Sequence, residues 1–138
     1  MKPIHDLEIK NLLMRANDAR ERAYTPYSNF NVGACLKGAS GAYYMGCNIE
    51  NSSYGATNCA ERTALFNAIY EGEREFEALA IVSDSSKFTV PCGICRQALS
   101  EFCSDDMPVI CCNNSGKYKV LSFGELLPYS FKATDMDK

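Results

Sequence analysis

Cys59-Ala60-Glu61 and Pro91-Cys92-Gly93-Ile94-Cys95 are the two stretches around which the rest of the chain is interpreted. Cys92 and Cys95 have the two-residue spacing that lets both thiolates reach one metal ion from the first turn of a helix. The chain between residues 59 and 92 is long enough for a helix, a turn and a strand that return Cys59 to the same ion. Three protein ligands leave a fourth position for water, as in catalytic zinc sites. The spacing therefore predicts one Zn²⁺ per chain.

Glu61 stands two residues after Cys59, and we interpret it as a general base beside the water rather than as a fourth ligand. If Cys59 and Cys92 each open a helix, the free amide groups and the helix dipole lower the pKa of their thiols. Three thiolates on one divalent ion leave a charge of about −1, which weakens the ion as a Lewis acid. Arg62 and Arg96, each adjacent to a motif, are predicted to offset this charge by hydrogen bonding to sulfur.

Two other interpretations of the cysteines stay open at this point. A C-x-x-C pair also occurs in thioredoxin-like dithiols, but that motif follows the first strand of its fold, whereas this one lies beyond residue 90. A closed structural zinc site would need a fourth ligand, and Cys103, Cys111 or Cys112 could supply it. Such a site would belong to a non-enzymatic module that binds a partner, and it would have no need of Glu61.

The two motifs fit the three-cysteine variant of the zinc deaminase signature. Beyond them, the chain resembles the small homotetrameric cytidine deaminases of the cytidine and deoxycytidylate deaminase superfamily. The matching stretches follow the order of the family: Tyr24-Thr-Pro-Tyr-Ser28, Phe30-Asn-Val-Gly-Ala34, Gly46-Cys-Asn-Ile-Glu-Asn-Ser-Ser-Tyr-Gly55, Cys59-Ala-Glu-Arg-Thr-Ala64, Pro91-Cys-Gly-Ile-Cys-Arg-Gln97 and Leu126-Leu-Pro-Tyr-Ser-Phe131. The chain departs from the family at Asn31, where proline is usual, and at Asn58, where a small apolar residue is common.

The resemblance implies zinc-dependent hydrolytic deamination of cytidine, and of 2'-deoxycytidine, in pyrimidine salvage. It also implies a set of substrate contacts: Asn48 and Glu50 on the ribose, Phe30 and Ala60 beside the nucleoside, Tyr54 near the subunit interface, and Phe131 stacked on the base in a neighbouring subunit's site. Each active site of the homotetramer would then be composite. A blasticidin-type aminonucleoside deaminase shares both cysteine motifs, but the ribose-binding stretch around Asn48 and Glu50 favours cytidine.

Composition and charge exclude several classes of function. With 46% hydrophobic and 22% charged residues, the chain has the composition of a soluble globular protein. Its net charge of −3 offers no positive field to a nucleic acid, and no apolar stretch is long enough to cross a membrane. Eight cysteines without a signal peptide predict a reducing, cytoplasmic setting. Five of them are expected to be free thiols: Cys35, Cys47, Cys103, Cys111 and Cys112.

The order of apolar patterns predicts an α/β arrangement. We expect helices at about 5–23, 59–71 and 91–102, and strands at about 29–37, 42–49, 76–82, 107–112 and 118–121. Leu7 and Ile94 are among the residues expected to face the core, and His5 is expected at the surface. A polar tail, 132–138, is expected to be disordered. Residues 1–138 are therefore predicted to form a single domain, a three-layer α/β/α sandwich with a mixed sheet of about five strands.

Overall fold

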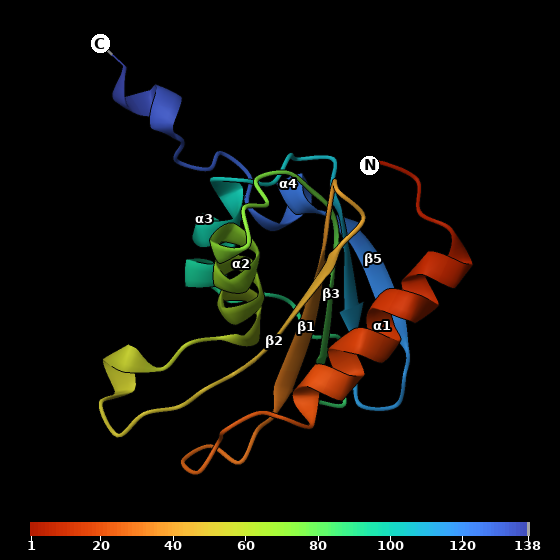
Figure 1. Ribbon diagram of the computed structural model, residues 1–138, viewed down its shortest axis with the longest axis vertical. Helices are drawn as coiled ribbons and strands as arrows, with labels where there is room; N and C mark the ends of the chain where they lie inside the picture. Colours follow the sequence, from red (N-terminus) through yellow and green to blue (C-terminus); the bar gives the residue numbers. More distant parts are fainter. Residues whose placement is uncertain (138) are drawn as a thin grey trace.

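The computed structural model describes residues 1–137 and contains a five-stranded mixed sheet with helices on both faces (Figure 1). Its elements, in chain order, are α1 (Asp6–Arg20), β1 (Val32–Gly38), β2 (Tyr43–Cys47), η1 (Tyr54–Ala56), α2 (Ala60–Tyr70), β3 (Phe76–Ser83), α3 (Gly93–Ser100), β4 (Pro108–Cys112), β5 (Tyr118–Ser122), α4 (Phe123–Leu126) and η2 (Ala133–Met136). The strands lie in the order β2-β1-β3-β4-β5. Only the β3–β4 pair is parallel among these neighbours. The predicted mixed sheet is confirmed.

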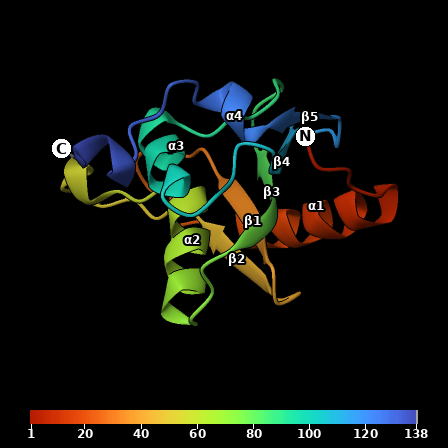
Figure 2. The ribbon, with the colours of Figure 1, turned by 90° about the horizontal axis from the view of Figure 1, so that it is seen from above.

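The helices form two separate layers. α1 packs on one face of the sheet, and α2 and α3 lie on the other, as the view from above shows (Figure 2). Because neighbouring residues of a strand point to opposite faces, Cys111 lies in the core under α2 and α3, whereas Cys112 lies in the core under α1. The three-layer sandwich is therefore confirmed. Cys111 and Cys112 face opposite layers, so they are unable to share one ion.

One end of the sheet collects the segments that later carry the site. Val32 at the start of β1 pairs with Ser83 at the end of β3, and Gly33 pairs with Cys47 at the end of β2. The chain leaves β2 and β3 at this end, and each strand is followed by a loop that leads into α2 or α3. In α/β sheets, sites commonly form in such places, where strands end and helices begin.

The structure corrects two predicted orientations. Leu7 is exposed and Ile9 is buried instead, because the buried stripe of α1 consists of Ile9, Leu12, Ala16 and Ala19. In α3, Ile94 is exposed, and the neighbouring Cys95 takes the buried position. Both errors arise from assigning a helical face by hydrophobicity alone, since a one-residue rotation of about 100° exchanges the buried and exposed faces.

Boundaries also differ from those predicted. The first helix ends at Arg20 and the first strand begins at Val32, because the residues between them form turns. The short helix α4 was not predicted, although Ser122 and Glu125 form a capping box that is readable as Ser-x-x-Glu. η2 lies where we expected a disordered tail. Among residues 1–137, no helix combines the length and the hydrophobicity needed to span a membrane.

Candidate active site

Three cysteine thiols from two different helices lie together. The Sγ atoms of Cys59, Cys92 and Cys95 are all within 4.8 Å of one another, and Cys59 Sγ lies 3.6 Å from Cys92 Sγ. Sulfurs bound tetrahedrally to zinc, each at about 2.3 Å, would lie about 3.8 Å apart. Cys95 is buried whereas Cys92 is exposed, so the cluster reaches the surface. The donor type and the spacing both fit a single zinc ion.

Two of these cysteines occupy helix N-termini, as predicted. Cys59 is the N-cap residue of α2 and Cys92 is the N-cap residue of α3. Neither side chain makes a capping hydrogen bond to its own helix, so both sulfurs are available to a metal. The unpaired amide groups and the helix dipole at these positions stabilise negative charge on sulfur.

Hydrogen bonds among the thiols and Arg62 shift the pKa values of the thiols. A hydrogen bond from the Cys95 thiol, with another from Arg62, lowers the pKa of Cys59 to about 5. The Arg62 Nη2 donates to Cys59 Sγ at 3.5 Å, as the predicted role of Arg62 requires. The hydrogen bond to Cys59, together with burial, raises the pKa of Cys95. A metal cation bound here would replace the thiol protons.

Glu61 is a buried carboxyl in the first turn of α2, with only 4% of its surface exposed. Burial raises the pKa of Glu61 to about 7, and the negative charge of Cys59 acts in the same direction. A carboxyl group with a pKa near neutrality can both accept and release a proton at physiological pH. This is the property that the predicted general base needs.

The segment that contains Asn48 and Glu50 runs beside the thiol cluster. Ile49 exchanges two backbone hydrogen bonds, of 3.0 and 2.9 Å, with Asn58, the residue that precedes the first cysteine of the cluster. On the other side, Tyr24 N donates to Asn48 O at 3.0 Å and Glu50 N donates to Tyr24 O at 2.9 Å. Backbone pairing therefore brings the predicted ribose-binding stretch next to the predicted zinc ligands.

Comparison with known families decides which of the interpretations applies. The family model of the cytidine and deoxycytidylate deaminase zinc-binding region matches residues 7–111. The chain belongs to the cytidine and deoxycytidylate deaminase family. The matched range includes all three cysteines of the cluster and Glu61. The family predicted from the motifs is thereby confirmed, and one zinc ion per chain agrees with both the family and the cluster.

Deaminases similar to this chain span nearly all of it. The cytidine deaminase of Sporosarcina psychrophila is 47% identical over 130 residues, which are 94% of this chain and 96% of the relative. That of Halalkalibacterium halodurans is 49% identical over 126 residues, 91% of this chain and 96% of the relative. The crystal structure of cytidine deaminase from Burkholderia pseudomallei superposes with a TM-score of 0.85 at 47% identity, covering 88% of this chain and 98% of that structure.

Arg96, unlike Arg62, has different partners in this deaminase from those predicted. Its Nε donates to Pro91 O at 2.7 Å and its Nη1 donates to Leu126 O at 2.6 Å. Hydrogen bonds to sulfur are found for Arg62 but not for Arg96 within residues 1–137. Arg96 therefore ties the start of α3 to the end of α4 rather than neutralising the cluster.

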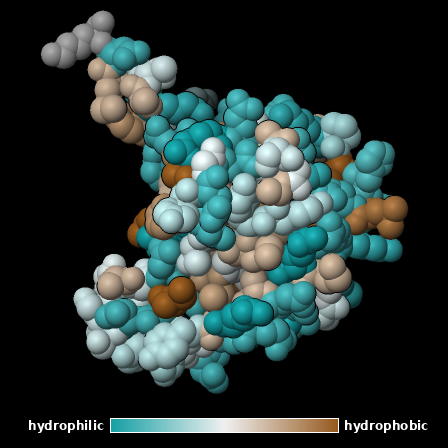
Figure 3. All heavy atoms as spheres, in the orientation of Figure 1, coloured by the Kyte–Doolittle hydropathy of each residue, from teal (hydrophilic) through white to brown (hydrophobic). Residues whose placement is uncertain are grey.

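The predicted nucleoside contacts differ in how accessible they are. Phe30, Tyr54 and Phe131 are 40%, 76% and 59% exposed, whereas Ala60 is fully buried in the core under α2. The Tyr54 ring meets the Tyr27 ring edge to face, with centroids 5.9 Å apart. The surface is indented between the projecting C-terminal segment and the η1 loop (Figure 3). The three aromatic side chains are thus free to contact another molecule, but the Ala60 methyl group is not.

Sequence reasoning assigned no role to Ser28, although it quoted this residue within a family motif. The Ser28 hydroxyl donates to the Glu50 carboxylate, and the Ser28 N–H donates to the same group at 3.1 Å. The hydroxyl hydrogen bond, offset in part by burial, lowers the pKa of Glu50. No pattern in the sequence could pair these residues, because they lie in separate segments that meet only in the folded chain.

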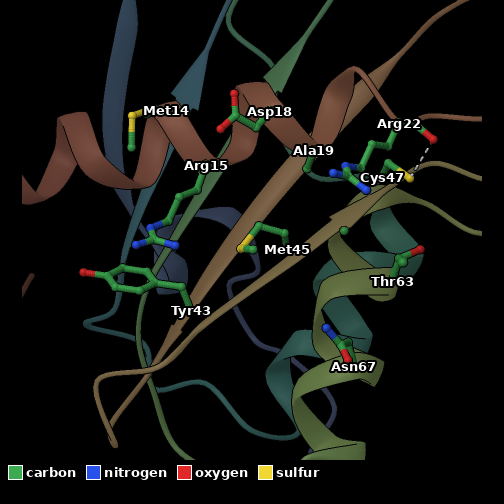
Figure 4. Close-up of a pocket in the computed structure, with 11 residues that line it drawn as sticks. Met14, Arg15, Asp18, Ala19, Arg22, Tyr43, Met45, Cys47, Thr63 and Asn67 are labelled. Carbon is green, nitrogen blue, oxygen red and sulfur yellow. Dashed lines mark hydrogen bonds between the residues drawn. The ribbon is translucent and has the colours of Figure 1, made fainter.

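A pocket of about 660 Å³ lies apart from the cysteine cluster, between α1, the edge strand β2 and α2 (Figure 4). The Arg15 guanidinium lies 4.2 Å from the centre of the Tyr43 ring, and Cys47 Sγ donates to Arg22 O at 3.4 Å. The residues that line this pocket include none of the predicted zinc ligands, catalytic residues or nucleoside contacts. The side chains that line this pocket are therefore different from those of the candidate active site.

Proposed function

We propose that this protein hydrolyses cytidine, and 2'-deoxycytidine, to the uridine product and ammonia. The observation that carries the proposal is the buried Glu61 carboxyl beside three thiols at the N-termini of two helices. Cys59, Cys92 and Cys95 are the residues that would hold zinc, which when bound lowers the pKa of a water molecule from about 15.7 toward 7. The relatives quoted above are named cytidine deaminases, which supports the choice of substrate.

Glu61 moves the protons of the reaction. Its carboxylate accepts a proton from the water that adds to C4 of the base and delivers that proton to N3. The proton of the new hydroxyl group on C4 then passes through Glu61 to the 4-amino nitrogen, the C4–N bond breaks, and C4 becomes a carbonyl carbon as ammonia leaves. The pKa of about 7 that burial gives Glu61 suits a group that must act first as a base and then as an acid.

Asn48, Glu50 and Phe30 orient the nucleoside in this proposal. Asn48 Oδ1 accepts from Val32 N at 2.9 Å and its Nδ2 donates to Phe30 O at 2.8 Å, so the amide is held in one orientation. One N–H of that amide is left for a sugar hydroxyl. Fixed contacts of this kind hold C4 near the attacking water, and such positioning can supply several kcal/mol of the barrier.

The assembly completes the site in this proposal. A homotetramer would cover the exposed aromatic side chains, and Phe131 of one subunit would stack on the base bound to its neighbour. Phe131→Ala is then expected to raise KM with little change in kcat, and light scattering is expected to show a tetramer. An unchanged KM would remove Phe131 from the site, and a monomer with full activity would contradict the composite arrangement.

The proposed setting is the cytoplasm, because the three thiols must stay reduced to bind zinc. There the reaction would return cytosine nucleosides to the uridine pool, which is the role of pyrimidine salvage.

The decisive experiment is the absorbance change when zinc-loaded protein is mixed with cytidine. Glu61→Gln is expected to keep one zinc per chain and to lose kcat by about 10²–10⁴-fold or more, as for removal of a general base. Glu101→Gln, which changes an exposed carboxyl at the end of α3 in the same way, is the matched control and should keep full activity. Substantial activity in Glu61→Gln would show that the base is another group.

The substrate class is tested in the same assay. Failure of the zinc-loaded protein to convert either cytidine or 2'-deoxycytidine would overturn the proposed function. Conversion of blasticidin S in its place would identify the protein as the aminonucleoside deaminase that shares both cysteine motifs.

A further inference from the structure

The Glu50 carboxylate is held by three hydrogen bonds from one short loop. Oε1 accepts from the backbone N–H groups of Tyr27 and Ser28, at 3.0 and 3.1 Å, and Oε2 accepts from the Ser28 hydroxyl. A carboxylate oxygen offers about two acceptor positions, so those of Oε1 are both used and one remains on Oε2. Glu50 therefore presents a single acceptor position in a fixed direction.

Ser28 also reaches the aromatic residue of the same loop. Its hydroxyl oxygen accepts from Phe30 N at 3.1 Å. The chain can turn back in this way because Asn29 has a φ of 54°, in the left-handed region that asparagine tolerates better than most residues. Asn29 N donates to Thr25 O at 2.9 Å and closes the turn. One hydroxyl thus joins the carboxylate on the sugar side to the aromatic residue on the base side.

Holding Glu50 in place before a ligand arrives favours binding. An unrestrained glutamate side chain loses rotamer freedom when it binds a hydroxyl group, and that loss weakens affinity. The loop restrains Glu50 before any ligand arrives, because two backbone N–H groups and one hydroxyl already hold it. Support of this kind from a neighbouring polar group is what keeps a binding residue in its productive geometry.

We propose that Ser28 is a positioning residue for nucleoside binding, which orients the Glu50 carboxylate toward the sugar and fixes Phe30 beside the base. This inference rests on the proposed deaminase function. Ser28 does not touch the reacting atoms, so its removal should weaken binding and leave the chemical step intact. The affected quantities are KM and the affinity for the product, not kcat.

The chain contains a matched control for this hydrogen-bond pattern. In the turn between β1 and β2, the Ser40 hydroxyl donates to the Glu73 carboxylate and accepts from Ala42 N at 3.3 Å. Ser28 does the same with Glu50 and Phe30 at the candidate site. Ser40→Ala therefore removes the same kind of contact away from that site, and it reports what the loss does to folding alone.

The test measures kcat and KM for cytidine and the inhibition constant of uridine. Loss of a hydrogen bond to a charged group predicts a KM and a uridine inhibition constant about tenfold higher in Ser28→Ala, with kcat within about twofold of wild type. Ser28→Thr keeps the hydroxyl and should restore most of the affinity. Ser40→Ala should leave all three quantities unchanged. If Ser28→Ala does not fold, Ser28→Cys, which has a weaker donor of similar size, should show an intermediate loss.

Two results would overturn the inference. The first is a KM in Ser28→Ala, or in Ser28→Cys where that variant replaces it, no different from that of Ser40→Ala. The second is full additivity with Glu50→Gln, because a residue that acts through Glu50 should have little further effect once the carboxylate is gone. An inactive zinc-loaded wild-type protein would instead refute the proposed function, so the two failures are distinguishable.

Discussion

Gly46 lies where the sheet packs closely on the helix that carries Glu61, and adding one methyl group there is a sharp test of the fold. A Cβ on Gly46 would lie 2.3 Å from Ala64 N and 2.5 Å from Ala60 O, both backbone atoms of α2. Ordinary contact begins at 3.4 Å, so α2 and β2 must separate by about 1 Å. Overpacking of this kind costs about 1–3 kcal/mol.

The displacement should also reach the candidate active site. α2 begins directly after Cys59, whereas the other two cysteines belong to α3, so a shift of α2 separates the two halves of the site. A misplacement of about 1 Å can lower activity by about 10²-fold. We therefore expect Gly46→Ala to lower both Tm and kcat/KM, and to weaken zinc binding.

Two other glycines separate the site effect from the stability effect. Gly55→Ala adds a methyl group with no atom within 4 Å and should match wild type. Gly33→Ala would place its Cβ 2.0 Å from Ala16 O of α1, on the opposite face, and should lower Tm with less loss of zinc affinity. Thermal unfolding, zinc titration and cytidine turnover at equal protein concentration measure these effects. A Gly46→Ala protein that equals Gly55→Ala in all three would mean that α2 does not pack on β2 as described.

Two further predictions concern thiol reactivity and pH. In the zinc-loaded protein, thiol labelling should modify the half-buried Cys47 well before Cys103, because burial raises the pKa of Cys103 to about 12. After zinc is removed with a chelator, the thiols of the cluster should be labelled as well. Peptide mass spectrometry measures the labelling, and equal rates for Cys47 and Cys103 would contradict the prediction. Burial opposes ionisation of Glu8, but hydrogen bonds from Lys37 and Tyr43 outweigh burial and lower the pKa of Glu8. The ionised Glu8 therefore stabilises the fold above its unfolded pKa of about 4.3, and this stabilisation is lost as the pH falls through the lower pKa of the folded state. Urea unfolding should therefore show that Glu8→Gln is less stable than wild type at pH 7, and the difference in free energy of unfolding should decrease below about pH 4. A difference that increases on acidification would contradict the prediction.

The parts of this protein that follow local rules could be predicted. Two-residue spacing in a first helical turn brings Cys92 and Cys95 together whatever surrounds them, and Glu61 follows Cys59 by the same short distance. Alternation along a strand likewise separates Cys111 from Cys112. The buried face of a helix was harder to predict, because Leu7 and Ile94 are as hydrophobic as the residues that are buried in their place.

The sequence by itself determined the Cys92 and Cys95 pair, the carboxyl that follows Cys59 and the order of helices and strands, because these depend on spacing and periodicity within a few residues. Folding then joined Cys59 to that pair across 33 positions. Only the tertiary structure decided which partners the long polar side chains find. Arg96 reaches Leu126 O across 30 positions rather than a sulfur atom, and Glu50 meets the Ser28 hydroxyl across 22 positions. The physical reason is that a polar side chain bonds to whichever complementary group folding brings within about 3 Å, and for partners this far apart in the sequence the spacing carries no information about that choice.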